Sequence, residues 1–430
     1  MTKRMHLLII GAGPGGYETA AEAVKRGLDV TLVTDGPLGG TCLNEGCIPT
    51  KTLIHNCCEL SGDLPSALAR KAAVISQLRA GIESLLKNVD IIYGKASFID
   101  AHTVKVNDRK ISADKTIICT GSVSSSLPVP GAGLAVDSSS ILEIDTVPER
   151  LAIIGGGVIG LEFAGIFNSL GSRVTVIEYC TNILPRLDSD LAKRLRQQMS
   201  RSGVSFILGA AVTAIGNDGQ NGLTVSYNQK DEECHIVADK VLMAVGRRPN
   251  IDSLNLDDIS VEYDRKGIKV DSSMRTSVPD IYAVGDVTGG YMLAHVASAQ
   301  GMRALNDITG VEDSINFDCV PAVVFTNPEF ASVGLSEDEC RTRGIEYSVH
   351  KSFYRANGKA VSSGDTEGLC KILCDCRGKI VGCHILGASA STIIGEAAVL
   401  VSLGAELDKA KWIIHAHPTL SEVLMNALRS

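Results

Sequence analysis

Two stretches of the chain repeat one pattern of apolar and polar positions. Each begins with an apolar run, passes through a glycine-rich turn and continues as a helix-like stretch. The helix-like stretch stops at Gly27 in the first and at Gly171 in the second, and a β-branched run follows. The two stretches span His6–Asp35 and Leu151–Glu178. Apolar runs that flank a helical segment are typical of parallel strands, so the pattern predicts the same strand–turn–helix–strand unit twice.

Both turns have the spacing Gly-x-Gly-x-x-Gly. The first glycine of such a turn permits a tight bend, the second lets the backbone approach a pyrophosphate, and the third lets the helix lie close to the strand. The phosphates then bind at the helix N-terminus, where backbone N–H groups favour anions. These glycines are Gly11, Gly13 and Gly16 in the first unit and Gly155, Gly157 and Gly160 in the second. The alternative is a pair of plain strand-to-helix connections, but two complete units predict two bound dinucleotides.

An acidic residue at the end of the second strand of such a unit binds the ribose hydroxyls. Glu178 has this position, 23 residues after Gly155. A carboxylate there repels a 2′-phosphate, and no arginine directly follows it, so the second unit is predicted to bind NAD rather than NADP. In the first unit the equivalent residue is Thr34, and Asp35 beside it is the candidate ribose contact.

Breaks in the pattern divide the chain into three predicted domains. Segments rich in serine and proline place a linker near residue 146, and another lies between Arg248-Pro249-Asn250 and the run IYAVGD. The domains are residues 1–145, completed by 271–316, then residues 146–270, and finally residues 317–430. Helices are predicted over 70–87 and 393–403, and strands over 371–373 and 379–386. We expect an α/β fold with two Rossmann-like dinucleotide-binding domains and a C-terminal α+β domain.

Composition and charge narrow the function classes. The 430 residues include 41 basic and 49 acidic ones, a net charge of −8, which argues against a nucleic-acid binder. No apolar run reaches the roughly 18 residues that a membrane span needs. The N-terminal apolar run ends at Gly11, too early for a signal peptide, so a cytoplasmic location is expected. The 13 cysteines are then expected to be mostly reduced, and any disulfide to be catalytic.

One cysteine pair stands apart from the others. Residues 39–51 read GGTCLNEGCIPTK, directly after the first unit. Cys42 and Cys47, five residues apart, can bring their sulfurs close enough to bridge if they share a helical turn. A thiolate at the start of a helix has a lowered pKa and is a competent nucleophile. The alternative is a pair of buried structural thiols, which we favour for the other cysteines.

Four groups of residues together resemble one family. They are the string GGTCLNEGCIPTKTL, the two glycine turns, GDVTGGYMLAHVASAQG at 285–301 and HAHPTLSE at 415–422. Their order along the chain is similar to that of the FAD-dependent pyridine nucleotide–disulfide oxidoreductases, in the dihydrolipoamide dehydrogenase branch. The resemblance covers essentially the whole chain, and it implies FAD at the first glycine turn and NAD at the second.

The resemblance also implies roles for single residues. FAD would be contacted by the first turn and by a further set: Thr120, Gly121, Asp286, Ala294 and Lys51. Lys51 would lie near the flavin and pair with Glu162 of the second turn. The NAD site would include Glu178 on the ribose and Gly246 near the nicotinamide half. No metal is expected.

In this family, Cys47 would stack on the flavin and Cys42 would exchange with the substrate dithiol. His417 would be the acid–base, held by Glu422. A carboxylate beside a histidine fixes the imidazole tautomer and raises its basicity, which favours this interpretation independently. His415 is interpreted as structural. The resemblance implies that His417 comes from the partner subunit, hence a homodimer through the C-terminal domain. The partner would be a lipoyl domain or lipoylated carrier protein of a 2-oxo-acid dehydrogenase or glycine-cleavage system.

Several features depart from the family pattern or leave alternatives. The loop after Thr34 is short and its acid comes one place late, and the segment after Lys51 is also short. Cys57-Cys58 is interpreted as part of an apolar helix face. Alternation along a strand accounts for most of a further group: Cys370, Cys374, Cys376 and Cys383. The alternative functions are a glutathione- or mercuric-reductase-like enzyme and a non-catalytic flavoprotein subunit.

Overall fold

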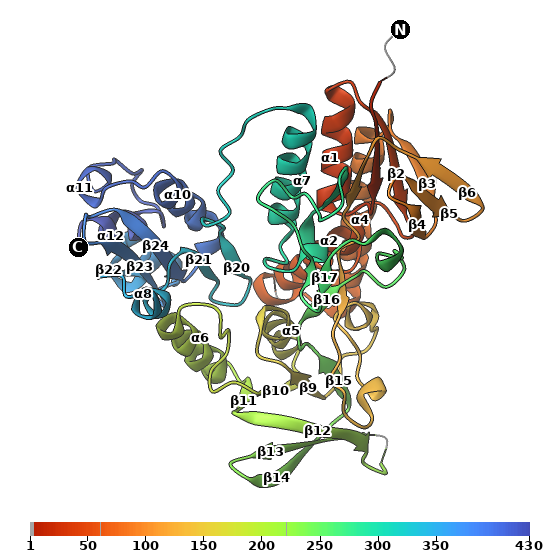
Figure 1. The fold of residues 1–430 in the computed structure, drawn as a ribbon. Helices are drawn as coiled ribbons and strands as arrows, with labels where there is room; N and C mark the ends of the chain where they lie inside the picture. The colour runs from red at the N-terminus through yellow and green to blue at the C-terminus, as the bar shows by residue number, and fades with distance from the viewer. Residues whose placement is uncertain (1–3, 61, 221) are drawn as a thin grey trace. The chain divides into compact units, whose positions relative to one another are not determined.

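The computed structural model describes residues 4–60, 62–220 and 222–430 (Figure 1). The chain forms two compact units, and each combines segments that are distant in the sequence. The first unit contains residues 1–52, 65–125 and 246–315, and the second contains residues 53–64, 126–245 and 316–430. Each unit contains one of the two glycine-rich turns.

The first unit is built on a parallel sheet with strand order β19-β7-β1-β2-β3. Its strands are β1 (His6–Ile10), β2 (Asp29–Thr34), β3 (Asp90–Tyr93), β7 (Lys115–Ile118) and β19 (Ile281–Ala283). The apolar run of β1 is almost wholly buried, as in parallel strands that are covered on both faces. Helices α1 (Pro14–Lys25) and α7 (Ala294–Thr309) lie side by side (Figure 1). They meet closely at Gly301, where a Cβ would lie 2.0 Å from Thr19 Oγ1.

Smaller elements complete the first unit. A three-stranded antiparallel sheet and two strand pairs surround the main sheet. They are β4 (Ala96–Asp100), β5 (Thr103–Val106) and β6 (Arg109–Ser112), β8 (Ser122–Ser124) with β16 (Arg247–Pro249), and β17 (Tyr263–Asp264) with β18 (Gly267–Ile268). Helices α2 (Gly40–Asn44), α3 (Cys47–Leu53) and α4 (Leu64–Leu85) follow β2.

The second unit repeats the parallel arrangement with strand order β11-β10-β9-β15. The strands are β9 (Arg150–Ile154), β10 (Arg173–Glu178), β11 (Ser205–Leu208) and β15 (Lys240–Met243). Helix α5 (Val158–Ser169) follows the glycine turn, and α6 (Ser189–Arg201) connects β10 with β11. An antiparallel sheet of β12 (Ala210–Asn217), β13 (Leu223–Gln229) and β14 (Glu232–Ala238) is attached to it.

The C-terminal part of the second unit is a five-stranded antiparallel sheet with order β20-β21-β24-β23-β22. The strands are β20 (Ala322–Val324), β21 (Phe330–Gly334), β22 (Tyr347–Phe353), β23 (Leu369–Asp375) and β24 (Ile380–Leu386). The helices are α8 (Glu337–Arg343), α9 (Gly358–Ser363), α10 (Ala390–Ser402), α11 (Leu407–Ala410) and α12 (Glu422–Leu428). Helix α10 packs on β21 and β24 and α12 on β22 and β23, which encloses one apolar core.

These sheets confirm the predicted fold class, with two Rossmann-like sheets and a C-terminal α+β region. The segment 246–270, predicted with the second dinucleotide domain, lies in the first unit. Strand β16 pairs with β8, and Leu254, Ile259 and Ile268 join the same apolar cluster as Leu8 of β1. The predicted helices and strands are present, with bounds that differ from the predicted ones by up to six residues. Residues 70–87 correspond to α4 and residues 393–403 to α10.

Gly160 and Gly165 of α5 allow a matched test of the helix packing. A Cβ on Gly160 would lie 2.1 Å from the carbonyl oxygen of Gly155, whereas among the described residues no atom lies within 4 Å of a Cβ on Gly165. Gly160→Ala should therefore destabilise the fold by about 1–3 kcal/mol through overpacking. Gly165→Ala should stabilise it by roughly 0.5–1 kcal/mol through helix propensity. Thermal unfolding midpoints measure both, and equal shifts would contradict the close packing of Gly160.

Candidate active site

The first glycine turn provides an open helix N-terminus. Gly13 precedes α1 with an extended backbone and has no side chain with which to cap the helix, and Pro14 begins the helix. Among the described residues no atom lies within 4 Å of the place where a Cβ of Gly13 would be. Gly11 and Gly16, by contrast, are tightly enclosed. A Cβ placed on Gly11 would lie 2.2 Å from the nearest atom, and one placed on Gly16 would lie 1.9 Å from the nearest atom. The turn is therefore rigid at both ends and open at its centre, which fits a dinucleotide pyrophosphate.

The cysteine motif is attached to this turn by its backbone. The N–H of Gly39 donates to the carbonyl oxygen of Ala12 at 2.9 Å. Gly40, where α2 begins, approaches so closely that a Cβ on it would lie 2.7 Å from Gly13 Cα. The helix that carries Cys42 is thus fixed beside the dinucleotide turn.

Cys42 and Cys47 do not share a helical turn, contrary to the expectation. Helix α2 ends at Asn44, α3 begins at Cys47, and Glu45 and Gly46 form a bend between them. The Asn44 side chain holds the bend by donating to the carbonyl oxygens of Leu38 and Gly40, at 3.0 and 2.8 Å. The bend, rather than a continuous helix, brings the two cysteines together.

The two sulfurs interact directly. The pKa of the Cys42 thiol is raised, first by its hydrogen bond with the Cys47 side chain and then by burial, while the charge of Lys51 lowers it. Cys42 is half-buried and Cys47 is exposed, and both are thiols. Their predicted roles in the redox chemistry stay predictions.

A second group of predicted FAD contacts is held by hydrogen bonds. Thr120 and Gly121 are fixed by Asn250: Thr120 Oγ1 donates to the Asn250 carbonyl oxygen at 2.6 Å, and Asn250 N donates to that of Gly121 at 3.0 Å. Ala294 is the first residue of α7, whose Gln300 accepts from the Gly285 N–H at 2.7 Å.

Asp286 is the last residue in a series of hydrogen bonds that runs from Arg247 through Ser122. Ser122 Oγ donates to its Oδ2 at 2.5 Å, and Arg247 Nε donates to Ser122 Oγ at 2.7 Å. Arg247 Nη2 also donates to the carbonyl oxygen of Ser122 at 2.8 Å. Burial raises the pKa of Asp286, and the Ser122 hydrogen bond and the charge of Arg247 oppose that rise.

Sequence reasoning missed Ser122, Arg247 and Tyr17. Ser122 directly follows Gly121, and Arg247 directly follows Gly246, so both stand next to residues that were singled out. Tyr17 follows Gly16, donates to Glu18 Oε1 at 3.1 Å and has its pKa raised to about 12, chiefly by burial. The sequence signal that could have identified these three residues is their position directly after a glycine of a predicted motif.

The ribose contact of the first unit stays a prediction. Asp35 is exposed, just past the end of β2. Thr34, the last residue of β2, is buried and donates from Oγ1 to the carbonyl oxygen of Gly36 at 3.0 Å.

The second glycine turn has the same open form as the first. Gly157 precedes α5 in an extended conformation, and no described atom lies within 4 Å of a Cβ placed on it. Gly155 has φ 114°, a backbone conformation that favours glycine, and a Cβ on it would lie 2.3 Å from the carbonyl oxygen of Ala244. Glu178, buried at the end of β10, accepts from the Gly156 N–H at 2.5 Å and from the Cys180 N–H at 2.7 Å. The carboxylate thus lies at the turn, and its contact with a ribose stays a prediction.

Two further predicted residues have local partners. Glu162 is buried in α5, and its Oε1 accepts from the Phe325 N–H at 3.1 Å. The predicted Lys51–Glu162 pair joins residues of different units and stays a prediction. Gly246 has φ 107°, and its carbonyl oxygen accepts from the Ser125 N–H at 2.9 Å.

Two histidine–carboxylate pairs lie in the C-terminal region. His417 Nδ1 is 2.9 Å from Glu422 Oε1, and 76% of the His417 side chain is exposed. The pKa of Glu422 is lowered, first by the hydrogen bond from the Thr419 N–H and then by the one to His417. His415 Nε2 is 2.7 Å from Glu396 Oε1, and only 5% of its side chain is exposed. Exposure thus distinguishes His417 from the buried His415, and the acid–base role of His417 stays a prediction.

Among the described residues, the cysteines other than Cys42 and Cys47 form no candidate active site. Cys370 and Cys383 are buried with their sulfurs 3.9 Å apart across β23 and β24. Within residues 4–60, 62–220 and 222–430, no group of three or more His, Cys, Asp or Glu side chains is placed to hold a metal ion.

Two family models cover nearly the whole chain. Residues 5–301 match the family described as pyridine nucleotide-disulphide oxidoreductase, and residues 320–428 match its dimerisation domain. The chain belongs to this family. A dihydrolipoyl dehydrogenase of Chlamydia muridarum is 38% identical, covering 98% of this chain and 96% of the relative. A dihydrolipoyl dehydrogenase of Geobacillus stearothermophilus is 37% identical, covering 98% of this chain and 94% of the relative.

Solved structures agree with the family assignment. RclA, an HOCl-induced flavoprotein disulfide reductase of Escherichia coli, has a TM-score of 0.91. It is 30% identical and covers 99% of this chain and 98% of that one. LpdA of Mycobacterium tuberculosis has a TM-score of 0.91 at 28% identity, covering 99% of each chain.

The protein is therefore a flavin-dependent disulfide oxidoreductase. The two cofactors predicted for it, FAD and NAD, are those of this family. Its C-terminal region is a dimerisation domain, which supports the predicted homodimer, and large apolar side chains of that domain are exposed: Val399, Leu403, Trp412 and Ile414. Among the described helices, none is long and apolar enough to cross a membrane.

The polar chain to Asp286 predicts a role for Arg247 in FAD binding. Arg247→Met removes both hydrogen bonds to Ser122 and the cation near Asp286. We expect FAD affinity to fall roughly ten- to hundredfold, because hydrogen bonds to charged groups contribute about 1.5–3 kcal/mol. Quenching of flavin fluorescence on titration into apoprotein measures the dissociation constant.

Arg248→Met is the matched control for this substitution. Arg248 is exposed and pairs with Asp252 at 2.8 Å, so its loss should leave FAD affinity within about twofold. An equal loss of affinity in both variants would contradict a specific role for Arg247.

Proposed function

We propose that the protein oxidises protein-bound dihydrolipoamide to lipoamide with reduction of NAD⁺. The observation that carries the proposal is the contact of Cys42 with Cys47 beside an open glycine turn. A redox thiol pair fixed at a dinucleotide site needs a dithiol or disulfide as its partner. The dihydrolipoyl dehydrogenases of Chlamydia muridarum and Geobacillus stearothermophilus, similar over nearly their full length, favour dihydrolipoamide as that dithiol.

The chain offers separate places for the two cofactors. The turn at Gly13, with Asp286 and the Thr120–Gly121 segment, would hold FAD, and the turn at Gly157, with Glu178, would hold NAD. When bound, FAD supplies the redox step that links thiols to a nicotinamide. Because the Glu178 carboxylate is already fixed by two backbone N–H groups, a 2′-phosphate would meet a buried negative charge. This arrangement favours NAD over NADP.

The proposed thiol–disulfide exchange uses only the substrate thiols and the two cysteines of the chain. In the oxidised enzyme Cys42 and Cys47 form a disulfide. A substrate thiolate attacks the Cys42 sulfur, which forms a mixed disulfide, and Cys47 leaves as a thiolate. The second substrate thiol then attacks the substrate sulfur of the mixed disulfide and releases Cys42. The substrate leaves as a cyclic disulfide, and its two electrons remain on the cysteine pair.

His417 is proposed to take the proton from the substrate thiol. With Glu422 accepting from Nδ1–H, the basic nitrogen is Nε2, on a ring that is mostly exposed. The carboxylate also stabilises the imidazolium that forms. In the dimer this histidine would serve the partner's cysteine pair. A lipoyl domain or lipoylated carrier protein as the substrate, and a cytoplasmic location, stay predictions.

A substrate panel with a cysteine variant tests the proposal. The holoenzyme should oxidise dihydrolipoamide with NAD⁺ far faster than with NADP⁺, and should reduce glutathione disulfide or mercuric ion slowly with either reduced nucleotide. Cys42→Ser should abolish dihydrolipoamide oxidation, because no sulfur remains to form the mixed disulfide, yet keep NADH-to-dye electron transfer. If glutathione disulfide were turned over faster than dihydrolipoamide, the proposed substrate class would be wrong. If none of the substrates in the panel were turned over, the result would favour a non-catalytic flavoprotein subunit.

His417→Gln tests the proposed base. Dihydrolipoamide oxidation should slow by about 10²–10⁴, the usual contribution of a positioned general base. NADH-to-dye electron transfer, which moves no substrate thiol proton, should be unchanged and serves as the internal control. Unchanged dithiol oxidation in this variant would place the base elsewhere.

A further inference from the structure

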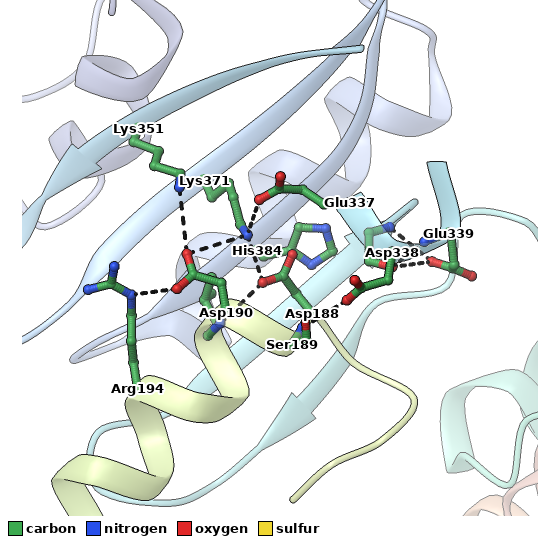
Figure 2. A network of polar contacts seen from close by, with 12 residues as sticks. Asp188, Ser189, Asp190, Arg194, Glu337, Asp338, Glu339, Lys351, Lys371 and His384 are labelled. Carbon is green, nitrogen blue, oxygen red and sulfur yellow. Dashed lines mark hydrogen bonds and ion pairs between the residues drawn. The ribbon is translucent and has the colours of Figure 1, made fainter. Parts of the chain in front are cut away.

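Lys371 is a fully buried cation inside the C-terminal sheet. It lies on β23, and its contacts are drawn in Figure 2. None of its side chain is exposed (0%). Its Nζ donates to Asp188 Oδ1 at 2.7 Å and to Glu337 Oε1 at 2.7 Å, and Asp190 Oδ2 is 3.8 Å away. A buried ammonium is costly unless it is paired and hydrogen-bonded, so these carboxylates are required neighbours.

The two close carboxylates come from different parts of the chain. Glu337 begins α8, and both α8 and β23 belong to residues 320–428, the dimerisation domain. Asp188 precedes α6 and lies within residues 5–301, the redox part of the family. Lys371 therefore links one carboxylate of its own domain with the carboxylate that caps α6 in the redox part of the chain.

Asp188 depends on Lys371 more than the other acids of the cluster do. Its Oδ1 accepts from Lys371 and from the Leu191 N–H at 3.1 Å, which caps α6. Its Oδ2 is buried and has no hydrogen-bond partner among the described residues. Asp190, by contrast, also pairs with Arg194 at 3.0 Å and Lys351 at 3.5 Å. Lys371 is thus the cation that compensates Asp188.

His384 is a further buried side chain at the cluster. His384 on β24 is 2% exposed, and its Nε2 is 2.9 Å from the Leu335 carbonyl oxygen. Burial lowers the pKa of His384, so the ring adds no cation to the site. Among the described residues, the ion pair of Asp188 is the one with Lys371 of β23.

The chain segment before Asp188 leads back to the second glycine turn. Cys180 N donates to Glu178, and Leu184 N donates to the Gly156 carbonyl oxygen at 3.0 Å. Ile183 packs on the same turn, with its Cγ2 3.2 Å from the place of a Cβ on Gly156. Residues 179–188 therefore form a rim that touches the turn at one end and Lys371 at the other.

We propose that Lys371 is a positioning residue for the pyridine nucleotide: from the dimerisation domain it holds, through Asp188, the rim of the second glycine turn. The inference rests on the proposed function of that turn as the NAD site. It adds a residue outside the two dinucleotide sheets to the residues that determine nucleotide affinity.

A matched pair of variants separates positioning from plain stabilisation. Asp188→Asn and Glu337→Gln each remove one negative charge that lies 2.7 Å from the same Nζ. Asparagine is also an efficient helix cap, so α6 keeps its N-terminus. Asp188→Ser, which caps but is too short to reach Lys371, is a second variant of the same kind. Only the Asp188 variants loosen the rim.

The measurement is the dissociation constant of NADH for the FAD-loaded enzyme, from the change in NADH fluorescence. Asp188→Asn and Asp188→Ser should raise it roughly five- to tenfold, within the usual range of coupling between two sites, and Glu337→Gln should leave it within about twofold. Thermal midpoints should fall similarly in Asp188→Asn and Glu337→Gln. The rate at which dihydrolipoamide reduces the bound flavin should not change in any of them.

Two results would overturn the inference in different ways. Equal NADH affinities in the Asp188 and Glu337 variants would show that the cluster only stabilises the fold, and the proposed function would stand. Absence of NADH binding by the unsubstituted enzyme, with flavin bound, would remove the NAD site itself, and with it both proposals.

Discussion

The candidate site depends on one physical constraint, the glycine caps that leave the backbone N–H groups at the start of α1 and α5 without a side-chain acceptor. A helix N-terminus needs hydrogen-bond acceptors, and glycine at the capping position supplies none from a side chain. At Gly13 and Gly157 the chain leaves open space in front of these groups, while the flanking glycines are enclosed so tightly that the turn cannot relax. Both turns thus have the form that the proposed dinucleotide sites require, and the rest of the candidate site is arranged around them.

The thiol pair illustrates how that constraint places chemistry. The bend between α2 and α3 brings Cys42 and Cys47 into contact, and backbone contacts of Gly39 and Gly40 fix the bend to the first turn. A side chain at residue 40 would collide with Gly13, so the position of the cysteines relative to the turn is set by the absence of a Cβ. The redox pair is therefore positioned by backbone packing.

Local pattern was enough to predict the main strands, the helices after each turn and the position of Glu178, because each depends on residues near in sequence. The bend between the two cysteines was not predicted, since Asn44 holds it through contacts that spacing does not show. The placement of residues 246–270 depends on pairing of β16 with β8 and on a shared core, both of which are long-range. Arg247, Ser122 and Lys371 were missed for the same reason: each acts on a residue far away in the chain.

Lys371 also shows why a buried charge need not be a stability device. An apolar residue at its place on β23 would avoid the cost of desolvating an ammonium, and replacing buried ion pairs by apolar groups is often neutral or stabilising. An apolar residue, however, has no directional bond with which to hold the capping residue of one particular helix. The cation holds Asp188 by a directional bond, whereas apolar packing would leave the rim of the second turn free to slide. If the second turn binds the nucleotide as proposed, such a fixed rim would keep that site in register with the domain that carries His417.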